Sequence, residues 1–353
     1  MKKILALVLA VALVLGLCSF ASAEEGKVKI GVSMPTKDLQ RWNQDGQYME
    51  EKLNEAGFVP VVQYASNDAN IQLAQVEAMI DEGCQIIVIA AEKGDSLGQA
   101  LTKAHDKGVK VIAYDRLLMS SEYVDYYATF DNEMVGTVQG NYIKEKLDLD
   151  NAEGPFYMEI TAGDPGDNNA PFFYKGAMDV LKPYIDAGKI VVRSGQTEFT
   201  DVATPDWKSE NAQKRAEDIL AANYAGGEKL DVWLCSNDST AYGVINALDN
   251  YDGEGWPIVT GQDCDKNNVK LMIEGKQAMS VFKDTRTLAA QVVKMIGQIM
   301  AGEEVDVNDR ETYDNGVVVV PSFLCVPVFG SADNYQELLL DTGYYTPADI
   351  GLE

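Results

Sequence analysis

The chain has 353 residues, 46% of them hydrophobic and 24% charged, which is the composition of a globular protein long enough for two domains. Its 29 basic and 55 acidic residues leave a net charge of −26, which argues against nucleic acid and anionic membranes as partners, because both need basic patches. With one histidine, His105, histidine-dependent triads and histidine-rich metal sites are nearly excluded.

The first 23 residues are predicted to be a signal peptide. Two lysines precede an apolar run from 4 to 17, and Ala21-Ser22-Ala23 offers a small-residue cleavage site. The alternative is a lipid anchor on Cys18, although the bulky Leu17 fits that pattern poorly. In either case we expect an exported protein that is periplasmic or extracytoplasmic. No later stretch approaches the roughly 18 apolar residues of a membrane span.

Strand-like and helix-like segments alternate along the rest of the chain. The predicted strands are 27–35, 59–64, 86–91, 110–114, 156–162, 190–194, 230–235, 258–261 and 277–282, with 123–130 as an edge strand and 317–328 as a final extended stretch. Helices are predicted over 70–82, 134–147, 169–185, 210–224 and 287–300. Two more are predicted to begin near 40 and 240, and two more to end at 107 and 274. This alternation predicts parallel sheets built from βαβ units. The number of strands predicts two α/β domains, and the lack of a Pro/Gly/Ser-rich linker predicts short crossings with a cleft between them.

Four cysteines remain after cleavage, each in or beside an apolar run and without C-x-x-C spacing: Cys84, Cys235, Cys264 and Cys325. This spacing argues against a zinc site. Export permits a disulfide, for which Cys235 and Cys264 are the candidate pair, but buried free thiols are the default interpretation.

Charged or amide side chains follow strand after strand. They are Lys37 and Arg41-Trp42 after the first strand, Asp115-Arg116 after 110–114, the run 164–169, Asp206-Trp207 before a helix, and then 236–238, 261–263 and 282–284. Ligands of open α/β sheets bind outside the carboxyl ends of the strands, so this recurrence predicts a binding cleft. Singly, each Asp or Asn is as often a helix N-cap, and each tryptophan more often belongs to the core.

The residue types in this set favour a neutral, hydroxyl-rich ligand. Aspartate only accepts hydrogen bonds, arginine and lysine only donate them, and a sugar hydroxyl does both, while an aromatic face packs on a sugar ring. Asp115 and Asp263 could also be read as a glycosidase pair, but Arg116 and Lys283 favour their ionised forms. There is no dinucleotide fingerprint, P-loop, nucleophile elbow or calcium loop, so we predict no enzyme, cofactor or metal.

Seven motifs carry a resemblance to a known family. They are Arg41-Trp42, 111–116, 127–132, 167–170, 236–238, 261–263 and 282–284. Over 27–345 the chain resembles the periplasmic substrate-binding proteins of monosaccharide ABC importers, especially the xylose-binding and multiple-monosaccharide-binding group. This implies a type I periplasmic binding protein fold, with two Rossmann-like lobes joined by a three-segment hinge. The N-terminal lobe would be 27–131 plus 283–302, and the C-terminal lobe 132–282 plus 303–353, with the ligand cleft between them.

The resemblance also implies roles for individual residues. Arg41 and Trp42 would hydrogen-bond to and stack on the sugar, and Asp115 and Arg116 would hold ring hydroxyls or the ring oxygen. The second lobe would supply Asn169, Trp207, Asn237 and Asp263, with Lys283 at a hinge. Lys37 is an additional candidate that matches the multiple-monosaccharide members better than the xylose-specific ones.

The sequence therefore predicts the solute-binding component of an ABC sugar importer. It would be a monomer that captures a free aldose of the xylose, arabinose, glucose or galactose type by hinge closure and delivers it to a permease with a cytoplasmic ATPase. The alternative is a sensing protein that presents its closed form to a chemoreceptor or sensor kinase. A secreted carbohydrate enzyme is a third hypothesis. A sugar-responsive repressor is excluded by the export signal and the missing helix-turn-helix.

Overall fold

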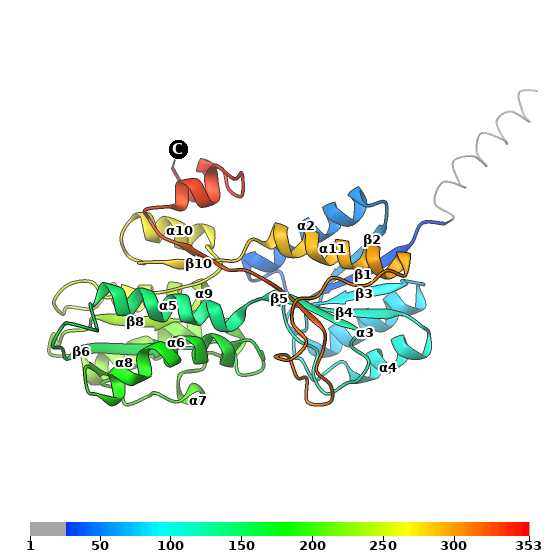
Figure 1. Ribbon diagram of the computed structural model, residues 1–353. Helices are drawn as coiled ribbons and strands as arrows, with labels where there is room; N and C mark the ends of the chain where they lie inside the picture. The colour runs from blue at the N-terminus through cyan, green and yellow to red at the C-terminus, as the bar shows by residue number, and fades with distance from the viewer. Residues whose placement is uncertain (1–25, 353) are drawn as a thin grey trace, which may run out of the picture.

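Two α/β lobes lie side by side in the computed structural model, which describes residues 26–352 (Figure 1). The first lobe contains a parallel six-stranded sheet in the order β11-β5-β4-β3-β1-β2. Its strands are β1 (Lys29–Met34), β2 (Val59–Tyr64), β3 (Ile86–Ile89), β4 (Lys110–Tyr114), β5 (Tyr126–Phe130) and β11 (Ser322–Cys325). Its helices are α2 (Gln40–Glu55), α3 (Ala69–Asp81), α4 (Gly98–Asp106) and α11 (Thr285–Ala301).

Helices cover both faces of this sheet, which is why its strands read as continuous apolar runs. Every residue of β3 is buried, and successive side chains point to opposite faces. Ile86 and Val88 pack with α2 and α11, whereas Ile87 and Ile89 pack with α3 and α4. Each fully buried side chain of this kind contributes roughly 1.5–3 kcal/mol.

The second lobe repeats the arrangement around a smaller sheet in the order β7-β6-β8-β9. Its strands are β6 (Phe156–Thr161), β7 (Ile190–Val191), β8 (Val232–Cys235) and β9 (Ile258–Val259), and β10 (Ser280–Phe282) pairs antiparallel with β12 (Val328–Gly330). Its helices are α5 (Asn132–Lys146), α6 (Ala170–Asp186), α7 (Phe199–Val202), α8 (Ser209–Asn223), α9 (Asp238–Leu248) and α10 (Lys266–Ile273), with short turns η1 (Pro205–Trp207), η2 (Gln336–Leu340) and η3 (Pro347–Ile350).

One pair of helices covers each face of the second sheet. Val232 and Leu234 of β8 pack with α5 and α6, and the alternate residues Trp233 and Cys235 pack with α8 and α9. Helices α5 and α6 touch through Gly136, where a Cβ would overlap the Phe173 carbonyl oxygen. A glycine there permits the close helix contact.

The chain crosses between the lobes three times: between β5 and α5, between β10 and α11, and between β11 and β12. The predicted α/β fold of two parallel-sheet lobes is therefore confirmed. Over residues 26–352 no helix has the length and apolar character needed to cross a membrane. The predicted signal peptide and Cys18 lie outside the described residues. The four described cysteines, Cys84, Cys235, Cys264 and Cys325, are buried free thiols.

Three local predictions were wrong. The segment predicted as an edge strand contains β5, which is internal, because β11 pairs with it from Ser322↔Tyr127 to Cys325↔Phe130. The same pairing places 322–325 in the first lobe, although the sequence assigned all of 303–353 to the second. The final stretch 317–328 is also not one element, since β11 ends in the first lobe and β12 begins beside β10.

Candidate functional site

A small cavity lies where the carboxyl ends of both sheets face each other, which is where ligands of open α/β sheets bind. Nine of the ten predicted site residues line it: Arg41, Trp42, Asp115, Arg116, Asn169, Trp207, Asn237, Asp263 and Lys283. Lys37 does not. It is exposed, and its ammonium lies over the Tyr64 ring, 4.5 Å from the centroid.

The first turn of α2 places Arg41 and Trp42 in the cavity wall. The Arg41 guanidinium contacts Asp45 on the next turn (Nε–Oδ2 2.9 Å) and Asp115 after β4 (Nη2–Oδ2 2.8 Å). Asp45 in turn accepts a hydrogen bond from the Tyr114 hydroxyl. Trp42 is 2% exposed, and the guanidinium carbons of Arg41 and Arg116 lie 4.8 and 5.2 Å from its ring centroid. The arginines are therefore held in place by contacts within the first lobe.

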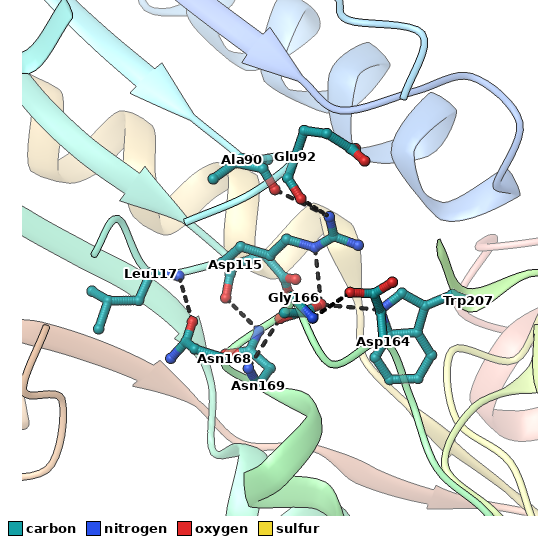
Figure 2. A network of polar contacts seen from close by, with 12 residues as sticks. Ala90, Glu92, Asp115, Leu117, Asp164, Gly166, Asn168, Asn169 and Trp207 are labelled. Atoms are coloured by element: carbon teal, nitrogen blue, oxygen red, sulfur yellow. Dashed lines mark hydrogen bonds and ion pairs between the residues drawn. The ribbon is translucent and has the colours of Figure 1, made fainter. Parts of the chain in front are cut away.

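Asp115 has a left-handed backbone, with φ of 57°. Its carbonyl oxygen accepts hydrogen bonds from Thr129 Oγ1 (2.9 Å), from Asn169 Nδ2 (2.7 Å; Figure 2) and from the Tyr127 hydroxyl. These bonds compensate for a conformation that few residues other than glycine adopt, and such strain gathers at functional sites. Burial alone would raise the pKa of the Asp115 carboxyl. The charges of Arg41, Lys283 and Arg116 instead hold its pKa below the usual value, so it is an acceptor.

Arg116 connects the two lobes. Its Nη1 donates to the backbone oxygens of Ala91 (3.0 Å) and Glu92 (3.3 Å), and its Nε lies 2.9 Å from Asp167 Oδ2 in the second lobe. Asp167 also accepts from Trp207 Nε1 at 3.2 Å and from the backbone N–H of Asn169 at 2.9 Å. Leu117 N–H donates to Asn168 Oδ1 across the same boundary, at 3.2 Å (Figure 2).

The tryptophan of the second lobe is held from two sides. Trp207 has a φ of 55°, and its ring lies against Gly163, where a Cβ would overlap the indole. Phe173 meets the ring edge-on, with the centroids 6.2 Å apart. Trp207 is 4% exposed, so its position depends on these contacts and on the bond to Asp167.

Asn237 is also the N-cap of α9. Its side chain accepts from Thr240 N–H at 2.9 Å, and the Thr240 hydroxyl lies 3.3 Å from the Asn237 N–H in the reciprocal arrangement. Asn237 therefore has both of the positions that were considered for such residues, because it caps a helix and also lines the cavity.

Three acids, Asp263, Asp265 and Asp238, lie in or behind the cavity wall on the side of the second lobe. Asp263 (φ 95°) lies 3.1 Å from Lys283 Nζ and 3.6 Å from Arg41 Nη1. Asp265 forms no ion pair among the described residues, and its buried Oδ1 has no hydrogen-bond partner there. Burial, followed by the charge of Asp263, raises the pKa of Asp265 to about 7. Behind it, Asp238 accepts from Asp265 N–H (2.8 Å) and Ser280 Oγ (2.8 Å), and burial raises its pKa well above the ordinary value.

Several cavity residues were missed from the sequence: Leu39, Asp167, Phe173, Ser239, Gln262 and Asp265. Asp167 and Gln262 belong to motifs that were recognised, so the motif boundaries could have identified them. Gln262 is 1% exposed. Its Nε2 donates to Ser236 O at 2.7 Å, and its Oε1 has no partner among the described residues. Phe173 follows Asn169 by one helical turn, which is the one local signal for it.

Mixed donors and acceptors, two tryptophans and a cleft between two βαβ lobes define a periplasmic binding protein. Residues 30–304 match the family described as "Periplasmic binding protein domain", and the chain belongs to this family.

Named relatives make the likeness more specific. The chain is 44% identical to the "Multiple sugar-binding periplasmic receptor ChvE" of Rhizobium radiobacter, over 98% of each chain. It is 33% identical to the D-xylose-binding periplasmic protein of Escherichia coli K12, over 93% of this chain and 94% of that one. An ABC transporter solute-binding protein from Clostridium phytofermentans, crystallised with bound β-D-glucose, is 62% identical. It superposes with a TM-score of 0.90 and covers 91% of this chain and 99% of that one.

Proposed function

We propose that this protein is the extracytoplasmic solute-binding component of an ABC sugar importer and that it binds a free aldose without chemical change. The observation that carries the proposal is the cavity, in which acids, bases and two tryptophans from both lobes face one small space. Hydrogen bonds to charged groups contribute roughly 1.5–3 kcal/mol each, so a few of them support micromolar binding.

The ligand class follows from the chemistry of the lining. Arg41, Arg116 and Lys283 are each paired with an aspartate, which leaves no free cation in the described lining for an anionic ligand. Sugar hydroxyls can both donate to the aspartates and accept from the basic groups. Glucose is the first candidate, because the 62%-identical relative was crystallised with β-D-glucose.

Binding by hinge closure would then deliver the sugar to a membrane permease and its cytoplasmic ATPase. The family and the predicted signal peptide support an exported, periplasmic location. The alternative is a sensing role through a chemoreceptor or sensor kinase, and the word "receptor" in the name of the 44%-identical relative supports it. The same sugar site serves either role.

A thermal-shift screen of the mature protein from Glu24 tests the proposal. The panel is glucose, xylose, arabinose, galactose, ribose and fructose, with Asp115→Asn as the site-deficient control. A ligand that binds only the folded state raises the melting temperature. A shift with glucose that disappears in the control supports the proposal, and shifts with several aldoses indicate a broad scavenger. No shift with any of the six sugars would overturn it.

A further inference from the structure

The C-terminal segment, residues 331–351, is anchored to the second lobe. Tyr344 and Tyr345 are 5% and 3% exposed and pack in one apolar cluster with Cys264, Met272 and other residues around α10. Lys266 Nζ also pairs with Asp349 Oδ1 at 2.5 Å. This packing joins the segment to α10 of the second lobe.

Two hydroxyls of this segment also reach the first lobe: that of Tyr344 donates to Gln44 Oε1 at 3.4 Å, and that of Tyr345 makes the closer contacts with α2. The Tyr345 hydroxyl accepts from Gln40 Nε2 at 2.7 Å and lies 3.3 Å from Gln44 Nε2, both on α2. The same hydroxyl donates to the backbone oxygen of Cys264 at 3.0 Å. Gln40 makes a second contact across the boundary, since its Oε1 accepts from Lys266 N–H at 3.2 Å.

These contacts lie directly behind the cavity wall. Gln40 precedes Arg41, and Cys264 lies between Asp263 and Asp265. The Arg41 and Asp263 side chains approach each other across the lobes at 3.6 Å. Neither Gln40 nor Tyr345 lines the cavity itself. The Tyr345 hydroxyl therefore joins the two chain segments that carry opposing cavity residues without facing the ligand.

Opening the hinge must break these contacts. Gln40 and Gln44 belong to α2, which packs on the first sheet, whereas Tyr345, Cys264 and Lys266 belong to the second lobe. A contact that exists only in the closed state favours that state, and it raises the apparent affinity of any ligand that binds the closed state.

We propose that Gln40, Gln44 and Tyr345 form an interlobe clasp that stabilises the closed state and thereby tunes ligand affinity. Tyr345 is a positioning residue and not a ligand contact. The inference rests on the proposed sugar-binding function, because sugar is the probe for closure.

Tyr345→Phe tests the clasp, since it removes the hydroxyl and keeps the ring. We expect D-glucose to bind roughly 3- to 10-fold more weakly, as the loss of one or two ordinary hydrogen bonds predicts, with a faster dissociation rate and an unchanged association rate. Small-angle scattering of the glucose-free variant should give a larger radius of gyration than the wild type, because more molecules are open.

Tyr335→Phe is the matched control. It makes the same chemical change in the same segment, at a partly buried tyrosine of the same cluster whose hydroxyl forms no hydrogen bond within the described chain. It should match the wild type in both readouts. Should Tyr345→Phe melt far below the wild type, Gln40→Ala carries the test instead, since it removes the bonds from the half-buried surface of α2.

The outcomes separate the two proposals. If wild type binds no sugar, the proposed function fails, and the scattering of the sugar-free variants still tests the clasp. If wild type binds glucose and neither Tyr345→Phe nor Gln40→Ala differs from Tyr335→Phe in dissociation rate or radius of gyration, the clasp is contradicted.

Discussion

The two walls of the cavity differ in how their charges are balanced. The first-lobe wall is assembled on its own: Arg41 is held by Asp45 and Asp115, and Arg116 by backbone carbonyls of its own lobe. None of the described lining residues from the second lobe is basic, although Asp167, Asp263 and Asp265 all belong to it.

This difference gives closure an electrostatic basis. Asp167 and Asp263 meet their cations, Arg116, Arg41 and Lys283, in the first lobe or at the hinge. In partly buried sites such pairs are stronger than in water. The first lobe therefore acts as a preformed receptor, and the second lobe has acids whose charges are balanced when the cleft closes.

The largest effect is expected from Asp115→Asn, in the preformed wall. Asparagine tolerates the left-handed backbone of this position but cannot pair with Arg41 or accept as a carboxylate does. We expect glucose binding to weaken by roughly 100-fold. Calorimetric titration measures this, and circular dichroism checks the fold. Near wild-type affinity in a folded variant would remove Asp115 from the site.

Arg116→Met breaks the shortest ion pair across the cleft among the described residues. It leaves the Asp167 carboxylate buried without its cation, and we expect affinity to fall by roughly 30-fold. Arg310→Met is the control, because Arg310 is exposed and lies 4.0 Å from its acidic neighbour. Equal affinities for the two variants would mean that the Arg116–Asp167 pair does not support closure.

Gly163→Ala tests the aromatic part of the second wall. The new methyl group would overlap the Trp207 ring and displace it from Asp167 and Phe173. Loss of one aromatic platform should weaken binding roughly 5- to 10-fold. Gly297→Ala, in α11, adds the same group where nothing lies within 4 Å, and it should bind like the wild type. An unaffected Gly163→Ala would show that the ring position does not matter.

The smallest effect concerns the pH dependence of stability. It depends on Asp265, the acid of the second-lobe wall that forms no ion pair among the described residues. The pKa of Asp265 is raised to about 7, against about 3.9 in an unfolded chain. Between these values the folded protein holds more protons than the unfolded chain, so the free energy of unfolding falls as pH rises. Asp265→Asn removes this contribution, so the variant should melt a few degrees above wild type at pH 8, with a smaller difference at pH 5.

Asp81→Asn is the control for this pH profile. Hydrogen bonds from Lys103 and Lys107 lower the pKa of Asp81 to about 2, so the residue is ionised in both states from pH 5 to 8. It should shift the melting temperature without changing its slope against pH. If the melting temperature of Asp265→Asn changes with pH as steeply as that of wild type, Asp265 is not an unpaired acid with a raised pKa in the folded protein.

The local hydrophobic periodicity of the sequence predicted most of the helices and strands. It placed the start of α2 at Gln40 and the strands β1 to β4 within a few residues, because both faces of the first sheet are apolar. It failed at β5, whose neighbour β11 comes almost two hundred residues later in the chain. A local pattern reports burial, but it does not identify the partner strand.

The sequence predicted the site residues that belong to polar motifs near the ends of predicted strands. Asp115, Asp263 and Trp207 were all recognised, and all three have positive φ, which sequence alone did not reveal. Gln262 and Asp265 were missed because their neighbour Asp263 was sufficient to define the motif. Phe173 lies inside α6, where an aromatic residue normally indicates core packing. The interlobe contacts of Tyr345 join residues about three hundred positions apart, which no local pattern predicts.

Calorimetric titration of D-glucose into the mature protein from Glu24 at pH 7 measures whether the cleft between the lobes binds an aldose. We predict saturable binding of one glucose per chain with a micromolar or lower dissociation constant, and much weaker binding in Asp115→Asn. No binding heat from glucose or the other five sugars, in a preparation that melts cooperatively, would contradict it.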